Sequence, residues 1–151
     1  MFSLVVEQEG KSDGPTTLAE AVERIQLGAL WDAALAEFVD AFDLAATPEE
    51  RYLMIAEEPG LTRDQRLDAL AGAIAEYLAK QHKLGRVPPW ASKPARFLDR
   101  PWHACPFEND AMREYLTFAS PAEFASRNIF TEERPLRRAR SPFGRQIPDA
   151  T

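Results

Sequence analysis

The sequence has little of several things that common folds and active sites require. It holds one cysteine, two histidines and seven scattered glycines in 151 residues. One cysteine excludes an internal disulfide framework, and the first residues lack the basic segment and cleavage site of a secretory signal, so we expect a cytoplasmic location. No run approaches the roughly 18 apolar residues that a membrane-spanning helix needs, so we expect no membrane association.

The same scarcity argues against catalysis and metal binding. The glycines form neither a P-loop nor a dinucleotide-binding fingerprint, and no G-x-S-x-G motif is present. His82, His103 and Cys105 are too few nitrogen and sulfur ligands for a structural zinc site. Acidic pairs such as Glu57 and Glu58 are adjacent, which points them apart on a helix. We therefore predict that the protein is not an enzyme and has no catalytic residue, metal or cofactor.

Charge is unevenly distributed along the chain. The net charge is −6, but residues 1–79 hold 16 Asp and Glu against five Lys and Arg, a net of −11. Residues 80–151 hold eight acidic against 13 basic residues, a net of +5. Such a chain can join its own halves, pair with a second copy, or present two faces to different partners. The acidic half argues against nucleic-acid binding by the whole domain, and the basic C-terminal segment stays open for it.

Helix signals dominate the chain from residue 16 onward. Capping boxes are predicted at four places: Thr17 with Glu20, Thr47 with Glu50, Thr62 with Gln65, and Ser120 with Glu123. Helix ends are predicted at Gly28, Pro59–Gly60, Gly85 and Asn128. Residues 30–45 space their apolar side chains as a helix does, residues 62–85 give the longest and most alanine-rich helix, and another helix is predicted over 107–119. "SLVVE" and "NIFT" are the short strand candidates.

These elements predict an all-α fold: a compact multi-helix orthogonal bundle with a Pro/Trp-rich connector and an Arg-rich C-terminal tail. Residues 1–15 are expected to be a flexible N-terminus and residues 16–133 a single helical domain. Residues 134–151 are expected to be a basic, partly disordered tail, with five arginines between positions 134 and 145.

The connector "PPWASKPARFLDRPW", residues 88–102, differs from the rest of the chain. It contains four prolines and two of the three tryptophans, Trp90 and Trp102, beside Arg96 and Arg100. The two arginines share a face if this stretch is helical, with Phe97 pointing into the core. Trp and Arg are enriched at binding hot spots, whereas a large aromatic in a small protein often belongs to the core. Both a binding surface and a plug that closes the core fit this segment.

Three stretches resemble small uncharacterised helical proteins of high-GC bacteria: "LAGAIAEYLAKQHKLGRVPPW", "PARFLDRPW" and "SPAEFASRNIFTEERPLRRA". The shared pattern is a long helix ending near Pro-Trp, an R-F-L-x-x-P-W turn, and a closing S-P-x-x-F-x-x-R-N-[IL]-F. It covers about residues 30–140. "WHACPF" departs from the more apolar stretch expected there. Neighbouring toxin–antitoxin or regulator genes are typical of such proteins, so the resemblance implies an antitoxin-like or accessory binding role.

Together these observations predict a non-enzymatic module that binds a partner protein. The acidic helices over residues 17–58 form one predicted surface, and the connector with the basic tail forms the other. The predicted partner-binding residues are Trp90, Arg96, Arg100, Trp102, Arg137, Arg138 and Arg140. The alternatives are a nucleic-acid-associated regulator that uses the basic tail, and a homodimeric structural module whose oppositely charged halves pair.

Overall fold

The computed structural model describes residues 17–104, 110–132 and 135–136. The predicted flexible N-terminus lies outside the described residues, as does the predicted tail except for residues 135–136. The helices are α1 (Leu18–Gln26), α2 (Trp31–Leu44), α3 (Pro48–Ala56), α4 (Gln65–Gln81), α5 (Asp110–Ala119) and α6 (Ala122–Ala125), with 3₁₀ turns η1 (Pro89–Ser92) and η2 (Pro94–Arg96) and strands β1 (Trp102–His103) and β2 (Ile129–Phe130). The prediction of a mostly helical protein is confirmed. None of the described helices is both long and apolar enough to cross a membrane.

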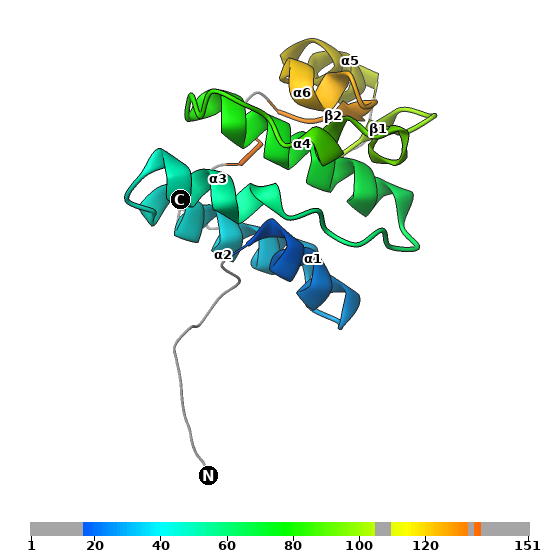
Figure 1. Cartoon of the computed structure of the whole chain (residues 1–151). Coiled ribbons are helices and arrows are strands. Elements are labelled where there is room, and N and C mark those ends of the chain that lie inside the picture. The colour runs from blue at the N-terminus through cyan, green and yellow to red at the C-terminus, as the bar shows by residue number, and fades with distance from the viewer. Residues whose placement is uncertain (1–16, 105–109, 133–134, 137–151) are drawn as a thin grey trace, which may run out of the picture.

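Helix α4 runs through the middle of the molecule (Figure 1). Helices α1, α2 and α3 lie on one side of it, and α5, α6 and the two strands lie on the other. The strands pair in parallel, with Trp102 opposite Ile129 and His103 opposite Phe130. The "NIFT" candidate therefore does contain a strand, and its partner is the end of the proline-rich connector.

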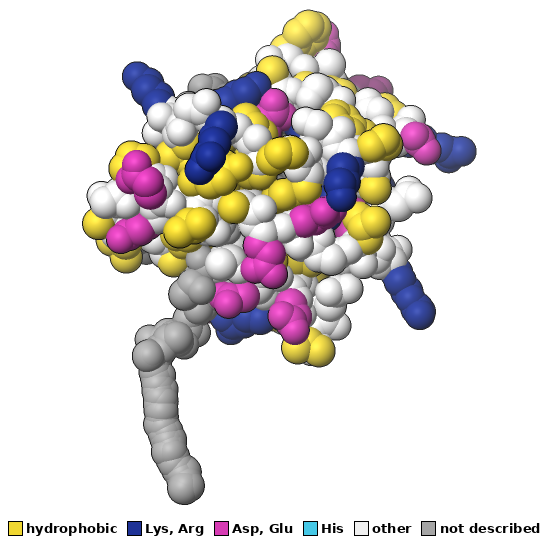
Figure 2. All heavy atoms as spheres, in the orientation of Figure 1, with side chains coloured by type: hydrophobic (Ala, Val, Ile, Leu, Met, Phe, Trp, Pro, Cys, Tyr) yellow, Lys and Arg dark blue, Asp and Glu magenta, His cyan; other side chains and the backbone are white. Residues whose placement is uncertain are grey.

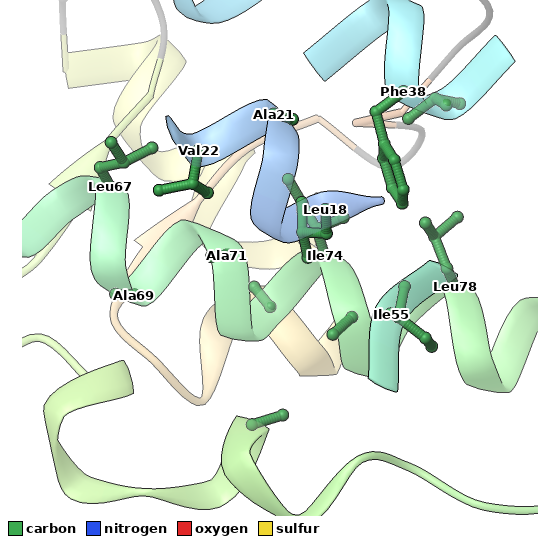
Figure 3. Packing of buried hydrophobic residues seen from close by; sticks show 14 of the residues in the cluster. Leu18, Ala21, Val22, Phe38, Ile55, Leu67, Ala69, Ala71, Ile74 and Leu78 are labelled. Carbon is green, nitrogen blue, oxygen red and sulfur yellow. The ribbon is translucent and has the colours of Figure 1, made fainter. Parts of the chain in front are cut away.

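The central position of α4 follows from its composition. Ten of its 17 residues are buried, and six of these ten are alanine or glycine. Small side chains allow neighbouring elements to approach on several sides of the helix. On the side of α1–α3, Ile74 and Leu78 belong to one apolar cluster with Leu18, Phe38 and Ile55 (Figure 3).

Several helix ends lie where the sequence predicts them. The hydroxyl of Thr17 accepts a hydrogen bond from the Glu20 N–H at 3.1 Å, and the Glu20 carboxylate accepts one from the Thr17 N–H at 3.3 Å. Gly28 has a φ of +114° directly after the last turn of α1, and Asn128 has a φ of +65°. Both positions need the left-handed backbone that Gly and Asn adopt most readily. Thr47 caps α3 by accepting from the Glu50 N–H at 3.1 Å.

The predicted cap of α4 is wrong. Its N-cap is Asp64, whose carboxylate accepts from the N–H groups of Arg66 and Leu67. The hydroxyl and N–H of Thr62 instead donate to the Asp68 carboxylate at 2.9 and 2.8 Å, so Thr62 holds the approach to the helix.

Three other end predictions also need correction. The left-handed residue that ends α4 is Lys83, with a φ of +54°, and Gly85 lies two positions further on. Ser120 does not cap α6, because its hydroxyl binds the backbone of Leu116 and Thr131. Glu50 reaches the N–H of Ala46 at 3.0 Å rather than that of Thr47.

Candidate functional site

The structure separates the predicted partner-binding residues from one another. Arg96 is fully buried and Trp90 is 5% exposed. Trp102 is half-buried and Arg100 is exposed. The turn η2 ends at Arg96 and the chain then extends, so Arg96 and Arg100 do not share a helical face. In this conformation Trp90 and Arg96 are structural rather than available to a partner, and Arg137, Arg138 and Arg140 lie outside the described residues.

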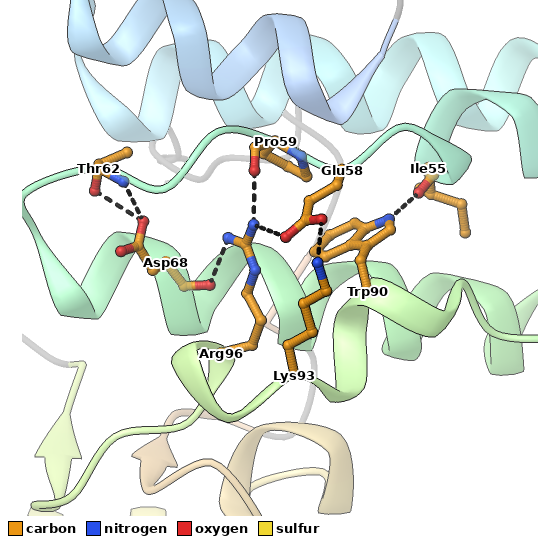
Figure 4. Close-up of polar contacts among 8 residues, drawn as sticks. All are labelled: Ile55, Glu58, Pro59, Thr62, Asp68, Trp90, Lys93 and Arg96. Carbon is orange, nitrogen blue, oxygen red and sulfur yellow. Dashed lines mark hydrogen bonds and ion pairs between the residues drawn. The ribbon is translucent and has the colours of Figure 1, made fainter.

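Arg96 ties the connector to the segment between α3 and α4 (Figure 4). Its Nη2 donates to the Glu58 carboxylate at 3.0 Å and to the Pro59 carbonyl at 2.6 Å, and its Nη1 donates to the Asp68 carbonyl at 3.3 Å. The guanidinium carbon lies 4.9 Å from the ring centroid of Trp90. These partners compensate the burial of the charge, which is otherwise strongly unfavourable.

Two further contacts complete this attachment. Trp90 Nε1 donates to the Ile55 carbonyl at the end of α3, at 3.0 Å. Lys93 Nζ lies 2.8 Å from the second oxygen of Glu58. Hydrogen bonds from Lys93 and Arg96 lower the pKa of the Glu58 carboxyl, which favours its charged form. The connector is therefore a plug that closes the core at this place.

Arg127, which has no role in the sequence-based prediction, forms a second buried hub on the other side. It is 1% exposed, and its Nη1 donates to the Glu76 carboxylate at 2.6 Å and to the Glu123 carbonyl at 2.7 Å. Its Nη2 donates to the Ala91 carbonyl at 2.7 Å. Burial raises the pKa of Glu76, but hydrogen bonds from Lys80 and Arg127 outweigh it and the pKa is lowered overall.

The two arginines meet over Gly72 in the middle of α4. A Cβ atom at this position would lie 2.9 Å from Cβ of Arg96, 3.2 Å from Nε of Arg127 and 3.3 Å from the Ala91 carbonyl oxygen. The glycine is therefore required by this close approach. The Nη atoms of both arginines bind carboxylate and carbonyl groups, so the two hubs join distant parts of the fold.

The described surface instead offers an open groove of about 980 Å³. It lies between the end of α1, the start of α2, the start of α4 and the chain that leads to β1. Its lining residues are Ile25, Gln26, Trp31, Thr62, Arg63, Asp64, Gln65, Arg66, Leu67, Leu98, Asp99, Arg100 and Pro101. Among the predicted partner-binding residues that the structure describes, Arg100 is the one that lines this groove.

The groove combines arginines with aromatic surface. Within the described ranges, Arg63, Arg66 and Arg100 form no ion pair with a carboxylate. The guanidinium carbon of Arg66 lies 5.1 Å from the ring centroid of Trp102. Trp102 in turn meets Trp31 edge-on, with 6.3 Å between ring centroids. The half-buried Trp102 thus packs against two groove-lining residues, and its predicted contact with a partner stays a prediction.

Sequence reasoning did not identify Trp31, Arg63 and Arg66 as site residues. Trp31 fits the apolar stripe of its helix, and nothing in the sequence shows that it faces a groove. Arg63 precedes the N-cap Asp64 and Arg66 lies in the first turn of α4, so helical spacing does not relate the two arginines and could not predict that they line one groove.

The histidines show no catalytic arrangement in the part of the chain that the structure describes. His103 stacks on Phe130, with ring centroids 5.2 Å apart, and Cys105 lies outside the described residues. His82 packs edge-on against Phe42, and burial lowers its pKa. The residues that are described contain no cluster of three His, Cys, Asp or Glu side chains arranged to hold a metal ion.

No protein-family model, curated protein or solved structure matches this chain. The resemblance to helical proteins of high-GC bacteria therefore receives no support from these comparisons, and the antitoxin-like role stays a prediction.

Proposed function

We propose that the protein is a non-enzymatic interaction module that binds a partner protein in the groove between α1, α2 and α4. The observation that supports this proposal best is the coincidence of three arginines without a carboxylate partner among the described residues and an aromatic wall provided by Trp31. Arg and Trp are the residue types that most often dominate binding energy at protein interfaces.

Exposed apolar side chains at the edge of the groove support the same function. Leu27 is 81% exposed and Leu30 is 76% exposed, and both lie in the α1–α2 turn beside groove-lining residues. A partner that covers this edge would remove apolar surface from water, which favours association.

A second contact surface is proposed on the acidic helices. Figure 2 shows acidic side chains gathered on the part of the surface where α1 and α2 lie. An antitoxin-like or regulatory accessory protein would use such a surface to cover a basic cleft of its partner, because complementary charge steers association. We also propose an orthogonal helix arrangement, a basic tail over residues 134–151 that adds to binding, and a cytoplasmic location.

The function is tested by photo-crosslinking in the native cells. A photoreactive phenylalanine analogue replaces Leu30 at the groove, and in a matched control it replaces Leu53 on α3, which is 67% exposed and does not line the groove. We expect a discrete protein adduct from position 30 that is weak or absent from position 53. Arg100→Glu in the Leu30-labelled protein should remove the adduct.

Other adducts would contradict the proposal and point to an alternative. Nucleic acid crosslinked in place of protein, and lost when residues 134–151 are deleted, would indicate a nucleic-acid-associated regulator. A second copy of the chain as the sole adduct would indicate the homodimeric module. Equal adducts from both positions, or none, would show that the groove is not the binding surface.

A further inference from the structure

The groove also indicates the chemistry of its occupant. We propose that it recognises an acidic chain segment that carries a large apolar anchor residue. This inference rests on the proposed function, because it specifies the part of the partner protein that enters the groove.

The groove lining carries more positive than negative charge. Of its two carboxylates, Asp64 already accepts hydrogen bonds from the Arg66 and Leu67 N–H groups, where its charge also meets the positive end of the α4 dipole. Three arginines against Asp64 and Asp99 leave the groove a net charge of +1, and a partner can keep its acidic residues away from the exposed Asp99. Arg63 and Arg100 are exposed as well, and they can swing to meet carboxylates in the planar two-bond geometry that guanidinium groups favour.

The apolar side is held in place before a partner arrives. Trp31 and Leu98 are both partly buried against the core cluster. The Trp31 ring packs edge-on against the Trp102 ring, and the Arg66 guanidinium lies over the Trp102 ring. The three side chains therefore hold one another in place. A rigid aromatic wall loses little conformational freedom on binding, which is why such residues serve well as anchors. A leucine or aromatic side chain of the partner would contact this wall.

A nucleic acid fits the same groove less well. Its backbone carries continuous negative charge, and the exposed carboxylates of Asp99 in the groove and Asp32 at the start of α2 would repel it. A peptide avoids this conflict because its acidic residues can be spaced to meet the arginines alone. The groove also offers the partly exposed side chains of Trp31 and Leu98, which are apolar surface that phosphates and sugars do not use.

The test measures binding of synthetic peptides to the full-length protein by fluorescence anisotropy. The first probe is a fluorescein-labelled peptide of Asp, Glu and Leu. Its two controls replace every acidic residue by Lys, or every Leu by Ser. We expect the acidic apolar peptide to bind best, each control to bind at least about tenfold more weakly, and affinity to fall as salt is added.

Variants of the protein locate the binding site. Arg63→Gln with Arg100→Gln should weaken the acidic peptide by about tenfold, a loss of about 1.4 kcal/mol. Lys83→Gln is the matched control, because this exposed cation lies at the opposite end of α4 and should leave binding unchanged. Both substituted arginines are exposed, so circular dichroism should show an unchanged fold.

Three results would overturn the inference. The Lys peptide could bind as well as the acidic one, or the double variant could bind like the unchanged protein. A labelled single-stranded oligonucleotide could bind more tightly than the peptide and be lost in the double variant, which would make the groove a phosphate site. If crosslinking from position 30 still captures a protein in these cases, only the proposed chemistry is wrong. If that crosslinking fails too, the interaction function itself is wrong.

Discussion

Replacing Gly72 by alanine is the sharpest test of the central packing. In an exposed helix interior, glycine to alanine stabilises by about 1 kcal/mol. Here the new methyl group would lie 2.9 Å from Cβ of Arg96, whereas carbon atoms pack best at about 3.5–4.0 Å. It would also press on Nε of Arg127 and on the Ala91 carbonyl, which is backbone and moves little. Overpacking of this kind costs about 1–3 kcal/mol, and displaced arginine hydrogen bonds cost about 1 kcal/mol each.

We expect a net loss of about 2 kcal/mol for Gly72→Ala, because the crowding outweighs the gain in helix propensity. Urea unfolding followed by circular dichroism would show this as a midpoint lowered by about 1 M, given a slope of about 2 kcal/mol per M. Gly60→Ala is the control, since a Cβ there meets nothing within 4 Å and its φ is not positive. It should change stability by less than about 1 kcal/mol. A Gly72→Ala protein as stable as the unchanged chain would refute the close approach.

Two other perturbations test the buried charges. Arg127→Met should lower the free energy of unfolding, measured in urea, by about 3 kcal/mol, because the Ala91 carbonyl loses its hydrogen-bond donor and the Glu76 carboxylate loses its buried cationic partner. The control is Lys80→Met, which removes an exposed cation that pairs with the same carboxylate and should cost less than about 1 kcal/mol. Burial lowers the pKa of folded His82 below its ordinary 6.5, so the unfolded chain binds the proton first. The contribution of neutral His82 to the free energy of unfolding should therefore be fully present above about pH 6.5 and be lost as the pH falls through the folded pKa. Thermal melting at a series of pH values measures this, and a His82→Gln variant whose melting temperature falls with pH as steeply as that of the unchanged protein would contradict it.

Local features of the fold were readable from the sequence because they depend on neighbouring residues. Thr17 and Gly28 act on groups within a few positions, so the bounds of α1 are predictable. The cap of α4 was missed for a local reason too. Thr62 and Asp64 both carry side-chain oxygens that can accept from a helix N-terminus. Because the hydroxyl of Thr62 donates to the Asp68 carboxylate, Asp64 is the N-cap.

The burial of the arginines was not readable, because it depends on groups far away along the chain. Arg96 meets Glu58 across 38 positions, and Arg127 meets Glu76 across 51. Charged residues are rarely buried, so a sequence reading places them at the surface unless their partners are known. Arg100 resembles Arg96 in sequence context and yet lies in the groove. The groove itself combines three separate stretches of chain, and its shape cannot follow from any one of them.

The reach of Arg127 has a consequence for the order of events during synthesis. Chains emerge from the ribosome N-terminus first, and domains fold as their residues become available. Helix α4 is complete at Gln81, yet the face around Gly72 receives its second cover only when Arg127 has emerged. Until then the carboxylate of Glu76 and the carbonyl of Ala91 lack the hydrogen bonds that Arg127 donates to both of them. The nascent chain therefore exposes one side of its central helix while residues 82–127 are synthesised, which is the interval in which a chaperone would bind it.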